Sequence, residues 1–391
     1  MRVAVLTSLF PVPLRPNEGV FAKRRWEGMA ARGHQIRIVH PLPLAPPRPL
    51  DWWLGHERRA RVRAPSAERS GALEIVRPRY LHLPRASVGN ARRFAKAGVG
   101  EVARSESSPE VVVLDYAWPA AMASRALCGA GYPVVVHGRG SDVLEVRDVE
   151  SLRPHLSEGI RRAGHWCAVS RDLVGAMDVL AGAAGHGKLT PNGVDADLFK
   201  PGDRSAARAR LLPECRGPLV LVVGHLIARK RPLAALQGFL DGCDPEAHLV
   251  FVGSGPLEQE LRDAIAAHAV GQRVHLVGEC RGEDLAGWYR AADLLVLASD
   301  REGRPNVVLE ALASGLPVVA TAAGGTPELM DRFPEQLVAP ADGLALGRAI
   351  RSTLADPPDP ELCRSAVAPY TWPAALDALE EQLRAAVESG R

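Results

Sequence analysis

Short runs of apolar, β-branched residues recur along the chain, and each is followed by a longer stretch of helical character. The runs in the first half cover residues 2–7, 35–39, 111–114, 134–136 and 167–169. Those in the second half cover residues 219–223, 249–252, 274–277, 294–297 and 317–320. Because these runs are continuously apolar rather than alternating, they predict strands of parallel sheets covered on both faces. The alternation of strands and helices, with one restart, predicts an α/β protein with two Rossmann-like, doubly wound domains.

The restart near residue 188 predicts where the domains divide. A chain of 391 residues exceeds what one hydrophobic core usually organises. We expect residues 1–187 to form the first domain and residues 188–370 the second. The tail, 371–391, carries one apolar stripe, at positions 375, 376, 379, 383, 386 and 387. It therefore predicts a helix that returns to bury this stripe on the first domain.

The composition excludes several classes of protein. Apolar residues make up 47% of the chain and charged residues 24%, which is typical of a folded globular protein. The net charge of +3 is too small for a nucleic-acid-binding protein, so we expect no such partner. The six cysteines are scattered, which argues against a zinc ribbon or a disulfide framework. No apolar run reaches the roughly 18 residues of a membrane helix, and the N-terminus lacks a signal-peptide pattern. These features predict a soluble cytoplasmic protein.

Residues 42–104 depart from this balance. They contain thirteen Arg and Lys residues against five acidic ones, with Trp52 and Trp53 among them. Such a segment is typical of a contact with an anionic partner, for example a membrane surface on its cytoplasmic side. It is equally typical of a solvated loop region in an arginine-rich protein, and the sequence leaves both interpretations open.

The segment 299–319 carries the clearest chemical pattern. Glu302 and Gly303 lie in a loop after a predicted strand, and Pro305 suits the first turn of a helix that ends at Gly315. The backbone N–H groups at the start of such a helix attract phosphate. Glu310 lies inside this helix, so one carboxylate can reach a sugar hydroxyl and the other a ribose.

The two glutamates, with seven residues between them, resemble the signature of retaining glycosyltransferases of family 4, whose fold is GT-B. The resemblance extends over nearly the whole chain, although residues 42–104 carry no match. It includes members that assemble polysaccharides such as teichuronic acid. The further matching motifs cover residues 7–11 with Gly19, 32–36, 137–142, 191–195, 223–230, 252–257 and 324–328.

This resemblance implies a role for each matching residue. Lys230 would neutralise the diphosphate of a nucleotide-sugar, Glu302 would bind the transferred sugar, and His137 would contact that sugar from the first domain. Asp142 would help to place the acceptor hydroxyl. The remaining donor-binding positions implied around the diphosphate, ribose, sugar and base are Gly19, His225, Arg229, Val277, Gly278, Cys280, Arg281, Gly303, Arg304, Asn306, Val307 and Glu310.

Two positions in the donor region invite specific expectations. His225 stands where many relatives carry Arg, and a histidine supplies positive charge only when protonated. If His225 serves in this way, activity should fall as the pH rises through neutrality. Arg304 lies in the loop that should face the donor sugar, which suggests a donor with an acidic or phosphate-like group.

The resemblance implies transfer of a sugar, with retained configuration, from a UDP- or GDP-type donor to a saccharide or lipid-linked acceptor. The sequence contains no convincing aspartate pair for Mg²⁺, so we expect no metal and no other cofactor. The main alternative is an epimerase or a phosphorylase-like enzyme on the same fold. Glycoside hydrolysis by Glu302 and Glu310 is disfavoured, because a loop and a helix interior do not bracket one scissile bond.

Overall fold

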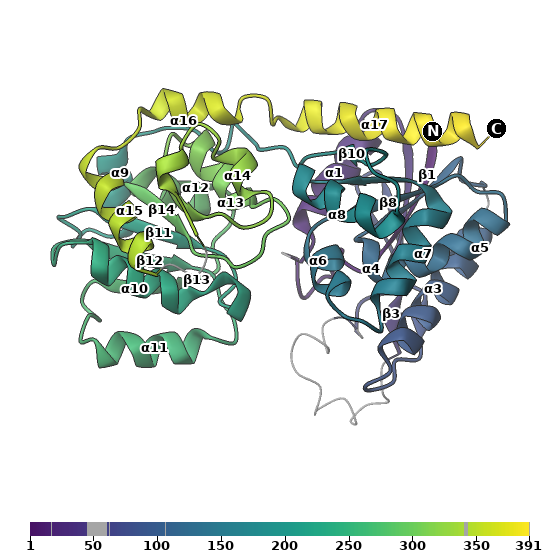
Figure 1. The fold of residues 1–391 in the computed structure, drawn as a ribbon, viewed down its shortest axis with the longest axis horizontal. Helices are drawn as coiled ribbons and strands as arrows, with labels where there is room; N and C mark the ends of the chain where they lie inside the picture. Colours follow the sequence, from purple (N-terminus) through teal and green to yellow (C-terminus); the bar gives the residue numbers. More distant parts are fainter. Residues whose placement is uncertain (17, 45–60, 62, 106, 340–342, 391) are drawn as a thin grey trace. The chain divides into compact units, whose positions relative to one another are not determined.

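The computed structural model describes residues 1–16, 18–44, 61, 63–105, 107–339 and 343–390. It divides the chain into two compact units, unit 1 with Met1–Pro191 and Ala375–Arg391, and unit 2 with Asn192–Ala374. Each unit contains a sheet with helices on both of its faces (Figure 1). Each sheet buries its own apolar clusters, so each unit has a core of its own.

The described residues of unit 1 form an eight-stranded sheet in the order β10-β9-β8-β7-β1-β2-β5-β4. Its strands pair in parallel, except in the β4–β5 hairpin. Because β1 pairs with β2 on one side and with β7 on the other, the strand order reverses there, and ligands of such sheets bind at this switch point. The strands are β1 (Arg2–Thr7), β2 (Gln35–Val39), β4 (Ala67–Ser70), β5 (Leu73–Val76), β7 (Val111–Asp115), β8 (Val134–Gly138), β9 (Gly164–Ala168) and β10 (Lys188–Leu189), with β3 (Leu42–Pro43) and β6 (Arg79–Tyr80) forming a separate pair.

The helices of unit 1 cover the two faces of this sheet with different partners. On one face, Trp26 and Met29 of α1 (Val20–Ala31) join a buried cluster with Leu379 and Leu383 of α17 (Trp372–Ser389). On the other face, a second cluster draws on the remaining helices. These are α3 (Ser87–Ala103), α4 (Ala117–Ala120), η1 (Ala121–Ala123), α5 (Ser124–Gly129), α6 (Ser141–Arg147), α7 (Arg153–Ala163) and α8 (Arg171–Ala181).

The C-terminal helix packs on unit 1, as its apolar stripe predicts. Leu376 meets α1 at Gly28, where a Cβ atom would lie 2.6 Å from the leucine Cδ1. Arg32, at the end of α1, adds an ion pair of 2.7 Å with Asp377. The prediction of a helix that packs back on the first domain is therefore confirmed.

The described residues of unit 2 form a parallel six-stranded sheet in the order β13-β12-β11-β14-β15-β16. The strands are β11 (Leu219–Val223), β12 (His248–Val252), β13 (Val274–Gly278), β14 (Leu294–Leu297), β15 (Val318–Thr321) and β16 (Leu337–Val338). One face packs against α9 (Arg204–Leu211), α12 (Gly282–Ala291), α13 (Asn306–Ala313), α14 (Thr326–Leu329) and α16 (Pro360–Val367). The other packs against α10 (Pro232–Gly242), α11 (Glu258–Ala267) and α15 (Gly343–Ala355), while η2 (Ala228–Lys230) and η3 (Pro334–Gln336) lie in loops.

The sequence predicts the α/β class correctly, and each of its strand runs overlaps an observed strand.

The interpretation of residues 42–104 as a solvated loop region is wrong for the described part of this segment. That part contains the β4–β5 hairpin and α3, whose Phe94 and Val102 are buried in the core. The short alternating run 73–76 is obscured in the sequence by the surrounding arginines. Trp52, Trp53, Arg48, Arg58 and Arg59 lie outside the described residues. Within the described ranges, no helix combines the length and apolar character needed to span a bilayer.

Candidate functional site

Two loops of unit 2 meet at the carboxyl ends of the neighbouring strands β11 and β14. The strand order of this sheet reverses between these two strands, so they form its switch point. Lys230 ends the short helix η2 after β11, and Glu302 lies in the loop after β14. Lys230 Nζ donates a hydrogen bond of 2.5 Å to Glu302 Oε1, and Arg229 Nη1 lies 3.9 Å from Glu302 Oε2. The fold thus brings together three residues that the resemblance assigns to the donor.

Backbone contacts fix the position of the Glu302 loop. The N–H group of Asp300 donates to the carbonyl of Arg229 at 2.8 Å, which ties the two loops to each other. Gly324 lies against Glu302, and a Cβ atom at this glycine would stand 1.7 Å from the Glu302 carbonyl oxygen. Its φ of +53° is also in the left-handed region. A larger residue at position 324 would therefore displace the Glu302 loop.

Helix α13 begins directly after this loop. Pro305 is the capping residue before the helix rather than a member of its first turn, and Asn306 is the first helical residue. The helix ends at Ala313, and Gly315 follows with a φ of +72°. The first backbone N–H groups of the helix, at Asn306 and Val307, have no carbonyl partner within the helix itself. The helix start is thus suited to an anion beside Lys230.

Glu310 is held inside unit 2 by a tyrosine. The hydroxyl of Tyr289, on α12, donates to Glu310 Oε2 at 2.8 Å, and both residues are buried. Burial and the adjacent Glu310 carboxylate raise the pKa of Tyr289 well above its usual value. The tyrosine therefore stays a hydrogen-bond donor at neutral pH and fixes one oxygen of Glu310. Contact of Glu310 with a ribose stays a prediction.

A small depression, with room for about one water molecule, lies at the same switch point. It is lined by Gly224, His225 and Lys230 on the β11 side and by residues 296–298 on the β14 side. His225 is exposed here, next to Lys230. The depression therefore has the position expected of a ligand site, and the charge role of His225 stays a prediction.

The loop after β13 lies along the same edge of the sheet, two strands away from β11. Val277 and Gly278 end the strand, and the φ of +74° at Gly278 turns the chain toward Cys280 and Arg281. Ser254, after β12, donates to Glu279 in this loop at 2.7 Å. The loop is thus tied to its neighbour, while its contact with a base stays a prediction.

The side chain of Arg304 points into unit 2, whereas the sequence suggests that it faces the donor sugar. Its side chain is fully buried, 3.4 Å from Glu328 and stacked over the ring of Tyr370 at 4.1 Å from the ring centroid. Arg304 is thus held by Glu328 and Tyr370, and its selection of an acidic donor stays a prediction without support from these contacts. The side chain turns inward from the loop, whereas the backbone carbonyl of the neighbouring Gly303 accepts from Gly325 at 3.2 Å.

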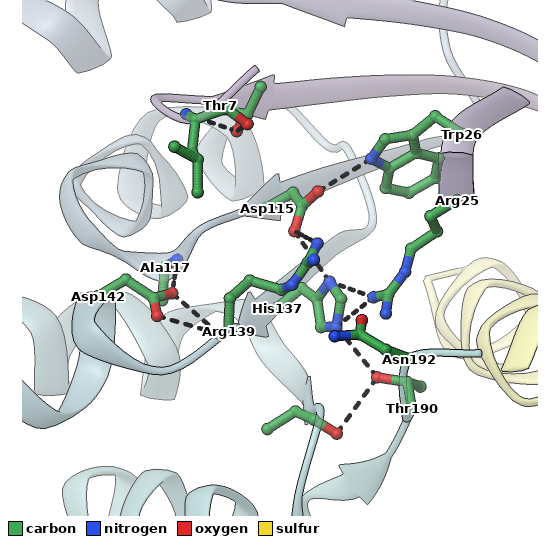
Figure 2. A network of polar contacts seen from close by, with 12 residues as sticks. Thr7, Arg25, Trp26, Asp115, Ala117, His137, Arg139, Asp142, Thr190 and Asn192 are labelled. Atoms are coloured by element: carbon green, nitrogen blue, oxygen red, sulfur yellow. Dashed lines mark hydrogen bonds and ion pairs between the residues drawn. The ribbon is translucent and has the colours of Figure 1, made fainter. Parts of the chain in front are cut away.

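In unit 1, His137 lies at the end of β8 in a buried polar cluster (Figure 2). Asp115, at the end of β7, is its direct neighbour in the sheet and lies 3.0 Å from His137 Nδ1. Arg25 Nη1 and Thr190 Oγ1 lie 2.6 and 3.1 Å from Nε2. Because a carboxylate can only accept and a guanidinium can only donate, Nδ1 carries the proton and Nε2 accepts. The ring is therefore enclosed by unit 1, and contact with a sugar would require one of these partners to move.

The charges of this cluster are set by burial. Desolvation, assisted by the neighbouring Arg25, lowers the pKa of His137 to about 3, so the ring is neutral. Desolvation and the nearby Arg139 lower the pKa of Arg25 to about 9, which leaves the guanidinium charged at neutral pH. Burial opposes the charged form of Asp115, but Arg139 and the hydrogen bond with His137 hold the pKa of this carboxyl well below its usual range. Asp115 is therefore the counter-ion on which the cluster depends.

Asp142 stabilises a turn and does not present a free carboxylate. Its side chain accepts from the backbone N–H groups of Ala117 at 2.5 Å, Gly140 at 2.7 Å and Arg139 at 3.0 Å. Figure 2 shows its oxygens contacting Ala117 and Arg139. Both oxygens are engaged by the turn, and the role of Asp142 in placing the acceptor hydroxyl stays a prediction. Gly19 precedes α1 with a φ of +71°, and its contact with a phosphate stays a prediction.

The boundary between the two units falls between Pro191 and Asn192. Thr190 contacts His137, and Arg25 Nη2 donates to the carbonyl of Pro191 at 3.4 Å, both within unit 1. Asn192 belongs to unit 2 and donates to the side chain of Asn306 at 2.8 Å, at the first residue of α13.

Sequence reasoning missed the partners of the residues it singled out. Arg25 and Trp26 are ordinary helix positions in the sequence, yet Arg25 contacts His137, and Trp26 donates to Asp115 at 2.9 Å. Tyr289 likewise carries no motif. The one available signal was Asp115, an acidic residue at the end of an apolar strand, where parallel sheets place their ligands. Among the described residues, no group of three or more His, Cys, Asp or Glu side chains is placed to hold a metal ion.

Comparison with known sequences identifies relatives. A family described as "Glycosyl transferases group 1" matches residues 217–356, which lie within unit 2. The teichuronic acid biosynthesis glycosyltransferase TuaC of Bacillus subtilis, itself described as putative, is 28% identical over 366 residues, which cover 90% of this chain and 88% of TuaC. The sulfoquinovosyl transferase SQD2 of Arabidopsis thaliana is 34% identical over 231 residues, 56% of this chain and 44% of SQD2.

Comparison with solved structures identifies the fold. Sucrose-phosphate synthase from Thermosynechococcus elongatus matches with a TM-score of 0.78 at 22% identity, over the whole of both chains. HepE from Anabaena, solved in complex with UDP, matches with a TM-score of 0.74 at 19% identity, over 98% of this chain and all of HepE. These likenesses confirm the GT-B fold class expected from the sequence.

Proposed function

We propose that this chain, whose residues 217–356 match the family described as Glycosyl transferases group 1, transfers a sugar from a UDP-sugar to a saccharide or lipid-linked acceptor in glycan biosynthesis. The observation that carries this proposal is the meeting of Lys230 and Glu302 at the switch point of unit 2, beside the start of α13. A cation and a helix start suit a diphosphate, and a carboxylate suits sugar hydroxyls. UDP is the preferred nucleotide because the structurally similar HepE was solved with UDP and with UDP-glucose; GDP is the alternative.

The donor would be held by the residues along this edge of unit 2. Lys230 and Arg229 lie where they would neutralise the leaving diphosphate, aided by the backbone N–H groups of Asn306 and Val307. Glu302 would then bind the transferred sugar. Glu310, oriented by Tyr289, would accept from the ribose, and the loop after β13 would contact the base.

The acceptor is proposed on two grounds. TuaC, which matches most of the chain, is described as acting in teichuronic acid biosynthesis, which suggests a polysaccharide or its lipid-linked precursor. Unit 1 also exposes Leu81 and Leu83 shortly before the exposed Arg85 and Arg92. Apolar and basic side chains together favour a peripheral contact with an anionic membrane, on its cytoplasmic side.

We further propose that transfer retains the anomeric configuration and proceeds without a metal ion. In the described site, the positive charge beside the helix start comes from Lys230 and Arg229, the charge that Mg²⁺ supplies in other transferases. Retention requires either attack from the side of the leaving phosphate or a covalent sugar intermediate. Incubation with a chelator should leave the rate unchanged, and restoration of a lost rate by Mg²⁺ would contradict the metal-free proposal.

A thermal-shift screen of UDP-, GDP-, ADP- and dTDP-sugars tests the donor. A donor at one hundred times its dissociation constant should add about 2.7 kcal/mol to the free energy of unfolding. Nucleotide release should then depend on an added acceptor, whereas a hydrolase would release nucleotide without one. If no nucleotide-sugar stabilises the protein, the proposal is wrong.

A further inference from the structure

Lys230 and Glu302 form an ion pair with each other. The side chain of Lys230 is 18% exposed and that of Glu302 is 7% exposed, so the ion pair is largely shielded from water. Arg229, at 3.9 Å, adds a second cation to the same carboxylate. In unit 2, therefore, the residues proposed to receive the donor are engaged with one another.

A diphosphate bound to Lys230 would compete with Glu302 for the same ammonium group. A diphosphate oxygen on Lys230 would lie within a few ångströms of the Glu302 carboxylate, because that carboxylate is only 2.5 Å from the same ammonium group. Like charges at such a distance repel strongly where water is largely excluded. The ammonium group therefore favours either Glu302 or a diphosphate, and binding of a diphosphate should release Glu302.

Release of Glu302 leaves a nearly buried carboxylate that needs new donors. A carboxylate without partners in such a place is costly. The hydroxyl groups of a sugar attached to the diphosphate supply those donors, whereas a nucleoside diphosphate without a sugar does not. The chemistry of the pair thus distinguishes the two ligands.

We propose that Lys230 and Glu302 exchange partners when the donor binds, and that this exchange makes Glu302 a specificity determinant for nucleotides that carry a sugar. Lys230 passes from Glu302 to the diphosphate, and Glu302 passes to the sugar hydroxyls. After transfer, Glu302 loses its sugar partner and competes again for Lys230, which weakens the hold on the product nucleotide. The inference rests on the proposed function and adds selection of donor over product.

Calorimetric titration with UDP and with UDP-glucose tests the exchange in the full chain. In Glu302→Gln, Lys230 has no competing carboxylate, so UDP should bind about tenfold more tightly than to wild type, which corresponds to ~1.4 kcal/mol. The preference for UDP-glucose over UDP should shrink by a similar factor. The matched control is Asp300→Asn, which removes the same charge from the same loop at a residue paired with Arg231 at 3.2 Å. It should leave both affinities within about twofold.

The possible outcomes separate the two proposals. Tighter UDP binding by Glu302→Gln alone supports the exchange, and a misfolded variant cannot produce it. Unchanged or weaker UDP binding by this variant, with wild type binding UDP normally, overturns the exchange and leaves the proposed function intact. Equal tightening by Asp300→Asn also overturns it, because general charge would then be the cause. Failure of wild type and both variants to bind either ligand would overturn the UDP-sugar function itself.

Discussion

The two units place charged residues at the same edge of similar parallel sheets but surround them in opposite ways. In unit 1, Asp115 and His137 are enclosed by Arg25, Trp26 and Thr190, which contact them at hydrogen-bond distance. In unit 2, Lys230 and Glu302 contact each other beside a depression that includes Lys230. The first cluster has donors and acceptors matched within the protein, whereas the second can exchange a partner for a ligand. Similar position in a fold therefore does not imply similar function.

The largest effect is expected from a change at Asp115 in unit 1, and it should be an effect on stability. In Asp115→Asn, the buried guanidinium groups lose their counter-ion, so the free energy of unfolding should fall by about 3–5 kcal/mol. Urea unfolding followed by circular dichroism measures this change. Glu158→Gln, at an exposed pair with Arg162, is the control and should leave the unfolding midpoint unchanged. A loss of activity at unchanged stability would instead place Asp115 in the chemistry.

The complementary change in unit 2 should affect activity alone. Lys230→Met removes the cation nearest the proposed diphosphate, so the turnover rate should fall about 10²–10³-fold while the melting temperature stays close to that of wild type. Arg231→Met removes the neighbouring cation, which pairs with Asp300, and should change the rate far less. A Lys230 variant that keeps a tenth or more of the wild-type rate would contradict the contrast between the units.

A smaller effect is expected at the hydrogen bond between Tyr289 and Glu310, which we expect to support both the fold and donor binding. Tyr289→Phe removes the hydrogen bond to the buried Glu310, which should lower the free energy of unfolding by about 1.5 kcal/mol. Because Glu310 then loses its fixed orientation, the KM for the donor should rise several-fold with little change in kcat. If stability falls but KM does not, the Tyr289–Glu310 pair supports only the fold.

The last effect is a pH dependence in unit 1, which is small at neutral pH. The pKa of His137 is lowered to about 3 in the folded protein, against about 6.5 for an unfolded histidine. The unfolded chain therefore binds an extra proton in this window, so this contribution to stability is complete above pH 6.5 and decreases toward pH 3. Its slope is at most ~1.4 kcal/mol per pH unit. His137→Gln, which can both donate and accept, should show a shallower loss of stability between pH 6.5 and 4.5; an identical slope would contradict the neutral ring.

Sequence reasoning succeeded where a property is local. Continuous apolar runs predict β1 and β11, and the proline and glycine positions at 305 and 315 bound α13 closely. Lys230 and Glu302 were assigned separately to one ligand, and their contact agrees with that assignment. Residues that follow adjacent parallel strands meet at one edge of the sheet, which is why residues from separate motifs lie together in unit 2.

The contacts that the sequence did not predict depend on the direction of side chains and on residues far apart in the sequence. Arg25 contacts a histidine 112 positions away, and that contact follows from how α1 packs on the sheet and from the register of Asp115 opposite His137. The inward turn of Arg304 follows from Glu328 and Tyr370. Neither the spacing nor the residue type of these positions encodes such directions.

The packing of α17 on α1 has a consequence for how the chain folds during translation. Residues 376–386 complete an apolar layer whose other members include Val3, Val5, Trp26 and Met29. On the ribosome, this layer stays open to water while the intervening hundreds of residues are translated, since chains emerge from the N-terminus. Unit 1 thus reaches its native packing only after unit 2 has been synthesised, and a prematurely terminated chain would expose a surface prone to aggregation.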